Sequence, residues 1–322
     1  MIPSEWLDEA RVRLDGLVRT TPLEWDERLC LYLKWENQQI TGSFKIRGAV
    51  NKVKSLQVWE RKRGLVAASA GNHGQGVALA AQETGSPVTV FASDHAVPAK
   101  IEAMRALGAD VRLVAGGYAD AEKNAIRYAQ ENECVFVSPY NDAQVIAGQG
   151  TLSLELQDQT HGKPVDVLLV PAGGGGLAAG IGLALERWEH RPKLIAVQST
   201  ASAFLHDLFF TGSQNATIEQ DSIADGLSGA VQEGSLTIPL VRKLVDDFWL
   251  VNEEEIAQAI SFAWMRYHQK IEGSAAVALA AGLSGKLAGK TGLVVLTGGN
   301  IQAELHEQIC RQWSAWARER VL

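Results

Sequence analysis

The chain has few cysteines and no excess of positive charge, and both shortages narrow the classes of protein to which it can belong. Its 322 residues include 3 cysteines, Cys30, Cys134 and Cys310. They lie far apart without the close spacing of a structural metal site, which favours reduced thiols in a cytoplasmic protein. The net charge is −7, without the excess of Lys and Arg that binding to nucleic acid requires, so we expect no nucleic-acid partner.

The sequence also lacks a convincing secretory or membrane-spanning segment. The first residues include Glu5 and Asp8, unlike a signal peptide. One uncharged run, 167–185, has the length of a membrane span, but Pro171 and the glycines at 173–176 would break a helix in lipid. A buried strand, a glycine loop and a helix fit this run better. We therefore expect a soluble protein with no membrane partner.

Short apolar, β-branched runs alternate with helix-like segments through most of the chain. Strands without polar alternation, separated by helices, predict parallel-rich sheets flanked by helices, an α/β fold. The predicted strands are 65–67, 88–91, 111–114, 135–137, 167–170, 194–197, 248–251 and 293–296. The predicted helices include 46–56, 77–83, 100–107, 177–188 and 253–267, the last with a cap formed by Asn252 and Glu255.

The strands also predict how the chain divides into domains. The first four fall within residues 48–142, which we expect to form a small domain. This domain is inserted in a large one made of residues 1–47 and 143–322. The polar stretch 201–229 is expected to be a long loop near a site. No repeat, low-complexity tract or regulatory module after residue 313 is expected.

Four consecutive glycines, Gly173, Gly174, Gly175 and Gly176, follow one predicted strand and precede a helix. Glycines there let backbone N–H groups approach an anion, and the helix N-terminus adds a favourable dipole. The spacing matches neither the dinucleotide fingerprint nor a nucleotide P-loop. A tight strand-to-helix turn is the alternative, but four glycines exceed what a turn needs. The run therefore predicts a phosphate site.

Other segments that follow predicted strands carry weaker signals. Residues 69–74 offer backbone donors with Asn72 and His73 where α/β sheets bind ligands, although a simple helix cap explains them equally well. The turn 297–300 places a hydroxyl after a strand. Glu272 is expected to be a cap or an ion-pair partner rather than a site residue.

Lys45 stands between an aromatic and an aliphatic residue at the start of a helix-like run, in the sequence Thr-Gly-Ser-Phe-Lys-Ile-Arg-Gly-Ala over residues 41–49. A lysine so placed can turn inward, lose solvation and become a usable amine. Most lysines are solvated surface residues, so this segment gains weight only beside the two glycine-containing ones.

Together these segments resemble the fold-type II family of pyridoxal-phosphate enzymes, specifically its threonine (serine) dehydratase and serine racemase branch. The resemblance runs in order over nearly the whole chain. It is carried by residues 21–23, 43–49, 69–73, 146–151, 171–177 and 297–300. It implies a two-lobed α/β fold like the tryptophan synthase β chain, with pyridoxal 5′-phosphate as the cofactor.

The resemblance also implies a role for each matched residue. Lys45 would form the Schiff base with the cofactor aldehyde, Phe44 would flank the ring, and Asn72 would bind its phenolic oxygen. The glycine loop and Leu177 would hold the phosphate, Gly226 would lie at the cofactor, and Thr297 would face the pyridine nitrogen. The substrate carboxylate would be bound by Ser69, Ala70, Gly71, Asn72 and His73.

The family's usual serine is replaced by Thr297, which keeps the hydroxyl and suits β-elimination over transamination. In the implied reaction Lys45 removes the Cα proton, the β-hydroxyl leaves, and the product becomes a 2-oxo acid and ammonia. Racemases of this branch carry a serine where this chain has Ala70, which cannot transfer a proton. They also bind a metal through acidic residues after a strand equivalent to 194–197; here residues 198–204 contain no carboxylate, so we expect no metal site.

L-Threonine or L-serine is the expected substrate. The alternatives are amino-acid racemisation of the serine racemase type, or dehydration of threo-3-hydroxyaspartate or a hydroxyectoine-derived compound. The segment 139–142 departs slightly from the family's usual acidic pair, which bears on the pocket. A small-molecule amino acid is thus the expected partner, and the resemblance implies a homodimer or homotetramer.

Overall fold

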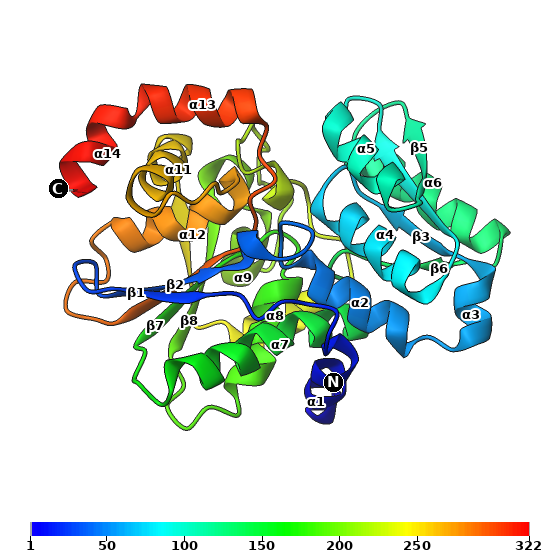
Figure 1. Ribbon diagram of the computed structural model, residues 1–322, viewed down its shortest axis with the longest axis horizontal. Coiled ribbons are helices and arrows are strands. Elements are labelled where there is room, and N and C mark those ends of the chain that lie inside the picture. Colours follow the sequence, from blue (N-terminus) through cyan, green and yellow to red (C-terminus); the bar gives the residue numbers. More distant parts are fainter. Residues whose placement is uncertain (1, 322) are drawn as a thin grey trace.

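The computed structural model describes residues 2–321 and forms two lobes, each built around its own sheet (Figure 1). The larger sheet has six strands in the order β1-β2-β10-β7-β8-β9, and the smaller has four in the order β5-β4-β3-β6. Only the β1–β2 pair is antiparallel among these neighbouring strands. The strands are β1 Leu23–Asp26, β2 Leu31–Trp35, β3 Leu65–Ala68, β4 Val88–Ser93, β5 Asp110–Val114, β6 Val135–Phe136, β7 Val167–Pro171, β8 Lys193–Ser199, β9 Asp247–Val251 and β10 Gly292–Leu296.

The helices lie between the strands and cover the sheets. They are α1 Glu5–Leu14, α2 Lys45–Ser55, α3 Val58–Arg63, α4 Asn72–Thr84, α5 Pro98–Ala106, α6 Tyr118–Glu131, α7 Ala143–Thr160, α8 Gly176–Leu185, α9 Phe204–Thr211, α10 Thr237–Leu244, α11 Glu253–Tyr267, α12 Gly273–Leu283, α13 Ala303–Gln312 and α14 Ser314–Val321. Three short 3₁₀ turns are η1 Glu36–Gln38, η2 Thr200–Ser202 and η3 Asp225–Leu227. The parallel-rich α/β architecture predicted from the sequence is therefore confirmed.

Alternate residues of the central strands enter two different cores in the large lobe. Val167 and Leu169 of β7 pack in the cluster that contains α11 and α12. Leu168 and Val170 of the same strand pack in the cluster that contains α7 and α8. Because strand side chains alternate between faces, a parallel strand covered on both sides must be apolar throughout. This is why these strands could be predicted from continuous apolar runs.

Two predictions about local structure need correction. The hairpin of β1 and β2 was missed, because β1 is an edge strand with exposed residues and β2 carries the buried Lys34. The stretch 201–229 was predicted as a loop, but it contains α9. Phe204, Leu205 and Leu208 of α9 are buried against the core, an apolar spacing that stabilises a short helix.

The predicted helices are present, α11 with the predicted bounds and the others with shifted ends. The helix predicted from residue 77 begins at Asn72, and that predicted over 177–188 runs from Gly176 to Leu185. The cap of α11 is confirmed, since the Asn252 side chain accepts from Glu255 N while Glu255 bonds back to Asn252 N.

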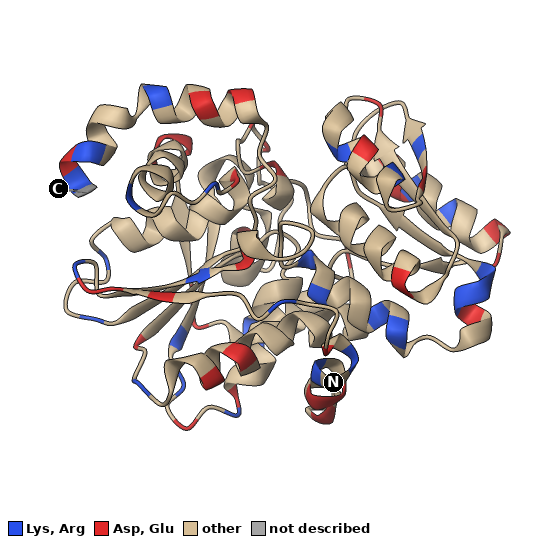
Figure 2. Cartoon of the chain, viewed as in Figure 1, with Lys and Arg blue, Asp and Glu red and all other residues tan. Residues whose placement is uncertain are grey.

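All strands of the small sheet lie within the predicted small domain 48–142. The predicted boundary at residue 47 falls inside α2, so this helix joins the two lobes without a break. Lys and Arg are interspersed with Asp and Glu over both lobes (Figure 2). No helix within residues 2–321 has the length and apolar character that a membrane crossing requires.

Candidate active site

The start of α2 lies against the end of β10. Phe44 N donates to Thr297 O at 3.0 Å, and Ser43 forms an isolated antiparallel bridge with Gly298. Thr297 is buried directly after the strand. The structure thus brings Phe44, Lys45 and Thr297 together, although more than 250 residues separate the two segments.

Close helix crossings hold Lys45 in place. A Cβ built on Gly76 of α4 would lie 3.3 Å from Lys45 C and from Ile46 N and Cα. A Cβ on Gly148 of α7 would lie 2.6 Å from Arg47 O. A side chain would not fit at Gly148, and at Gly76 it would push the neighbouring backbone away by a few tenths of an ångström. Both α4 and α7 therefore pack closely against the first turn of α2.

Lys45 is partly exposed as a residue, and the pKa of its amine is shifted. Its Nζ donates to Pro139 O at 3.2 Å and lies 5.3 Å from the centre of the Phe44 ring. Burial lowers the pKa of Lys45 to about 8, and the nearby Glu272 carboxylate opposes this shift. A substantial neutral fraction therefore exists near pH 8, as a nucleophile or base requires.

Glu272 belongs to the site, which corrects the expectation of a cap or ion-pair partner. It precedes α12 but its side chain forms no cap; Oε1 instead accepts from Asn72 Nδ2 at 2.6 Å. Asn72 Oδ1 accepts in turn from Asn300 Nδ2 at 2.6 Å. Burial raises the pKa of Glu272 to about 7, with Asp225 adding to the shift and Lys100 opposing it.

The glycine loop is enclosed by other segments of the chain. A Cβ on Gly174 would overlap the Tyr140 ring, one on Gly176 would lie 3.0 Å from Tyr140 Cα, and one on Gly173 would lie 3.1 Å from Leu227 Cα. Gly175 has φ +85° and caps α8. Side chains are thus excluded here, and the unpaired N–H groups of the first turn of α8 remain available to an anion.

Two further residues predicted at the cofactor adjoin this loop. Leu177 is buried in the first turn of α8. Gly226 N donates to Ser274 Oγ at 3.0 Å, within the short turn η3 whose Leu227 packs on Gly173.

The loop 69–73 reaches the site at the start of α4. Ser69 N donates to Phe91 O, and Ser69 Oγ accepts from Gly71 N at 3.1 Å. Ala70, Gly71 and Asn72 are partly exposed, and because Gly71 has no side chain its exposed atoms belong to the backbone. The His73 ring is buried and donates from Nε2 to Val137 O at 2.8 Å. Nε2 therefore has a structural contact, whereas Nδ1 has no hydrogen-bond partner within residues 2–321.

These residues fit pyridoxal phosphate in their chemistry. The glycine loop at a helix N-terminus suits the phosphate of the cofactor. The Lys45 amine, with its lowered pKa, suits the aldehyde. Several buried polar atoms close to the start of α2 also have no hydrogen-bond partner within residues 2–321: Thr41 Oγ1, Ser43 Oγ and His73 Nδ1. Such atoms are uncommon in a folded chain unless a ligand or water completes them.

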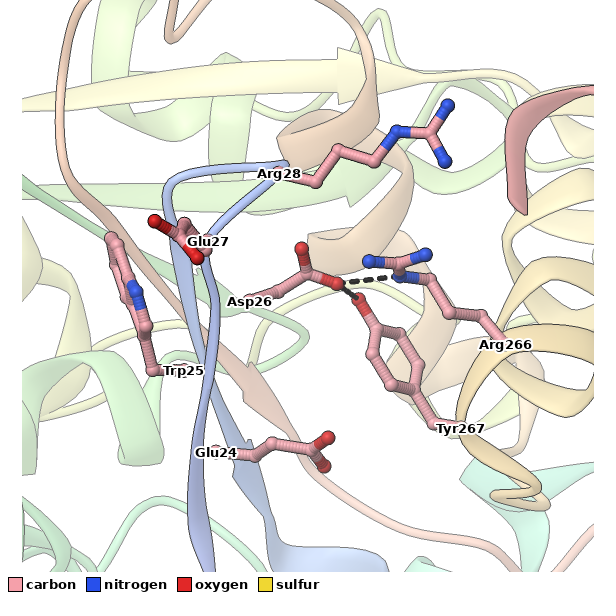
Figure 3. Close-up of a pocket in the computed structure, with 7 residues that line it drawn as sticks. All are labelled: Glu24, Trp25, Asp26, Glu27, Arg28, Arg266 and Tyr267. Carbon is pink, nitrogen blue, oxygen red and sulfur yellow. Dashed lines mark hydrogen bonds and ion pairs between the residues drawn. The ribbon is translucent and has the colours of Figure 1, made fainter. Parts of the chain in front are cut away.

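A separate surface pocket lies at the β1–β2 hairpin and the end of α11 (Figure 3). Its buried Asp26 accepts from Arg266 Nε at 2.5 Å and from the Tyr267 hydroxyl at 2.6 Å. These contacts tie the edge hairpin to α11. None of the predicted site residues lines this pocket, so we regard it as structural.

We expected no metal ligands in the segment that follows β8. Glu253 of α11 reaches the end of β8, but Oε1 accepts from Ser199 and Ser222 and Oε2 from Ile223 N. Within residues 2–321 no group of three or more His, Cys, Asp and Glu side chains could hold a metal ion. The three cysteines are free thiols.

Comparisons with known proteins show the family. A family profile described as pyridoxal-phosphate dependent enzyme matches residues 14–298. The L-threonine ammonia-lyase of Thermotoga maritima is 42% identical over 316 residues, covering 96% of this chain and 78% of the relative. A catabolic L-threonine dehydratase of Staphylococcus aureus is 38% identical, covering 92% of this chain and 88% of the relative.

Solved structures of a threonine deaminase and of a serine racemase are similar to this chain over nearly its whole length. The processed form of threonine deaminase isoform 2 from Solanum lycopersicum has a TM-score of 0.88 and 28% identity, covering 97% of this chain and 88% of that one. Serine racemase from Dictyostelium discoideum has a TM-score of 0.84 and 32% identity, covering 94% and 99%. The chain therefore belongs to the family of pyridoxal-phosphate dependent enzymes, with the two-lobed fold-type II architecture.

Proposed function

We propose that the protein is an ammonia-lyase that eliminates water from a β-hydroxy amino acid, L-threonine or L-serine, to give a 2-oxo acid and ammonia. The observation that carries the proposal is the Lys45 amine, with its pKa lowered to about 8, held at the junction of α2, α4 and β10. The names of the relatives from Thermotoga maritima and Staphylococcus aureus support the same substrate class.

Each residue of the site has a proposed task. Lys45 holds the cofactor covalently through Nζ, with Phe44 beside the ring. The glycine loop, with Leu177 and Gly226, holds the phosphate, Asn72 the phenolic oxygen and Thr297 the ring nitrogen. When bound there, pyridoxal phosphate supplies a conjugated ring that accepts the electron pair left on the substrate Cα.

The protein's own residues then move the proton. The neutral Lys45 amine, once freed by the substrate amine, takes the Cα proton. The β C–O bond breaks, and the hydroxyl leaves as water with the proton that Lys45 took from Cα. The released enamine is hydrolysed by water to the 2-oxo acid and ammonia. The backbone of 69–73 orients the substrate through its carboxylate, so that the Cα proton faces Lys45.

Racemisation is the second candidate, because serine racemases are among the similar structures. It requires a second proton-transferring group on the opposite face of Cα. The residue before Gly71 is Ala70, which has no titratable atom. We therefore favour elimination over racemisation.

The test is a panel of L-threonine, L-serine and threo-3-hydroxyaspartate, with 2-oxo acid and ammonia measured together and D-amino acid followed by chiral chromatography. We expect 2-oxobutanoate from L-threonine and pyruvate from L-serine. Lys45→Ala should abolish turnover and the visible band of covalently bound cofactor, while Lys123→Ala, on the exposed side of α6, should keep both. Turnover that survives Lys45→Ala would refute the assignment.

We also propose a homodimer or homotetramer in the cytoplasm, with lobes bounded near residues 48 and 142. Light scattering of the purified protein measures the mass of the assembly directly.

A further inference from the structure

A lysine from outside every matched motif lies over the loop that we propose for the substrate carboxylate. Lys100 is in α5 of the small lobe, and both its Cδ and its Nζ lie 3.9 Å from the position of a Cβ built on Gly71. Gly71 stands in the middle of the loop 69–73. A carboxylate bound to the accessible backbone of this loop would therefore be within reach of the Lys100 amine.

The loop itself offers no positive charge to a carboxylate. Residues 69–72 are uncharged. His73 does not supply one, because burial lowers its pKa to about 3, and its Nε2 already donates to Val137 O. Backbone N–H groups alone provide hydrogen bonds without a full counter-charge, and hydrogen bonds to charged groups are the stronger class. Lys100 supplies the missing charge.

Lys100 is paired at present with a residue of the other lobe. Its Nζ lies 3.4 Å from Asp225 Oδ2 in η3, the turn that packs on the glycine loop. The Asp225 side chain is 67% exposed, whereas that of Lys100 is 18% exposed. An exposed carboxylate can return to water at little cost, since such ion pairs contribute little stability. Lys100 can thus exchange Asp225 for another carboxylate without leaving its place.

The remaining charged groups near Lys100 fit this exchange. Glu272 interacts electrostatically with both Lys100 and Asp225, and with Lys45. Glu272 is held by Asn72 Nδ2, so it is fixed in the site and is not the group that must move. Asp225 is the carboxylate that a substrate can replace.

We propose that Lys100 is a specificity-determining residue that binds the α-carboxylate of the substrate, and that the substrate displaces Asp225 from it. This inference rests on the proposed function, because it places the substrate carboxylate at the loop 69–73. It adds a contact from the small lobe and gives the enzyme a means of rejecting amines that lack a carboxylate. It also couples substrate binding to release of the Lys100–Asp225 contact between the lobes.

The experiment compares two ligands that differ only in the carboxylate. L-Alanine has no β-leaving group and L-alaninamide has no carboxylate, and both can be titrated through the visible absorbance of the bound cofactor. The variants are Lys100→Met, Lys100→Arg and Asp225→Asn in the cofactor-loaded enzyme. Lys123→Met is the matched control for a lysine lost from the surface of the small lobe.

Lys100→Met should weaken L-alanine binding by roughly 10- to 100-fold, the loss expected for a charged hydrogen bond. It should leave the affinity for L-alaninamide within about twofold of the parent value, because this ligand has no carboxylate to pair with Lys100. Lys100→Arg should recover most of the affinity, and Asp225→Asn should bind L-alanine more tightly than the parent. In turnover, Lys100→Met should raise KM by more than it lowers kcat.

Equal losses for both ligands in Lys100→Met, or no loss of L-alanine affinity, would overturn the carboxylate contact. Unchanged L-alanine affinity in Asp225→Asn would overturn the exchange. Failure of the parent protein to release a 2-oxo acid would instead overturn the proposed function, and the preference for L-alanine over L-alaninamide would still decide the role of Lys100.

Discussion

Asn72 Nδ2 lies 2.6 Å from Glu272 Oε1, although 200 residues separate them in the sequence. The contact joins the start of α4 in the small lobe to the start of α12 in the large lobe. Asn300, after β10, completes it by donating to Asn72 Oδ1. The amide of Asn72 is thus oriented from both ends, with its nitrogen toward a carboxylate and its oxygen toward an amide. The same hydrogen bond holds the Glu272 carboxylate in place, and this carboxylate raises the pKa of the nearby Lys45 amine.

Glu272→Gln should shift the titration of Lys45 to lower pH. The Glu272 carboxylate opposes the effect of burial on the pKa of Lys45, so a neutral amide in its place should leave that pKa below about 8. The measurement is competitive acetylation of Lys45 across a pH series in cofactor-free protein. Glu254→Gln, an exposed carboxylate of α11, is the control. An unchanged or raised titration of Lys45 would contradict the electrostatic link.

The pH dependence of turnover should follow the same amine. Only the neutral form of the freed Lys45 amine can accept the Cα proton. Because kcat reports the substrate complex, in which Lys45 is free, kcat should rise with pH and level off above the pKa of this amine, which is about 8 in the protein alone. Well below that pKa the rate should fall roughly tenfold per pH unit. Because Lys45 and Glu272 interact, the profile reports values that belong to the pair. A rate that decreases from pH 6 to pH 8 would be incompatible with a lysine base.

Gly174→Ala should weaken cofactor binding without unfolding the protein. The new methyl group would overlap the Tyr140 ring, and overpacking of this kind costs about 1–3 kcal/mol. The overlap exists without the cofactor, so this cost falls on folding stability; a loop that shifts to relieve it should also lose pyridoxal phosphate affinity, measured by titrating cofactor-free protein. Tyr140→Ala in the same chain should recover part of the loss. Gly117→Ala, with nothing within 4 Å of its added Cβ, should bind the cofactor like the parent.

The sequence predicted most of the sheet framework for a physical reason. Parallel strands buried on both faces are apolar throughout, so strands such as β7 and β10 can be recognised from the sequence as continuous apolar runs. Lys45 and the glycine loop, which we propose to hold the cofactor, were singled out from the sequence because the chemistry expected of them depends on neighbours in the chain. The edge strand β1 was not predicted, since one of its faces meets solvent and its polar residues interrupt the apolar run that marks a buried strand.

The parts of the site that were missed depend on contacts between distant segments. Glu272 has the local appearance of a cap, and only the tertiary fold brings the start of α12 close enough to the start of α4 for it to bond Asn72. Lys100 belongs to no motif, and Tyr140 covers the glycine loop from a segment whose sequence showed only a mild departure. Such contacts are set by how the lobes pack, which spacing in the sequence does not reveal.

Arg47→Met should strongly destabilise the fold. Arg47 is buried and donates to Glu36 through Nε at 2.8 Å and through a terminal nitrogen at 2.7 Å, and that nitrogen also lies 2.8 Å from Glu155 Oε2. Burial works against a charged Glu36, yet Arg47 holds the pKa of Glu36 below its usual value. Removing one partner leaves a buried charge, which costs about 3–5 kcal/mol.

Urea unfolding of Arg47→Met measures this loss. Glu36→Gln combined with Arg47→Met should lose less stability than the two single variants added together, since the pair is removed as a unit. Strict additivity would show that the two side chains do not depend on each other.

His73 should make the fold sensitive to mild acid. Burial lowers the pKa of His73 to about 3 from the ordinary 6.5, and the nearby Lys45 adds to the shift. Between these values the unfolded chain binds a proton that the folded chain does not, so the free energy of unfolding falls as the pH is lowered. At pH 5 the loss from this one residue is about 2 kcal/mol relative to pH 7. Urea unfolding of His73→Gln should show a pH slope smaller by up to one proton between pH 6.5 and pH 5, whereas substitution of the exposed His95 should keep the parent slope. The same slope in both variants would mean that the buried imidazole takes up its proton without unfolding, and that the contact of Nε2 with Val137 O does not keep it neutral.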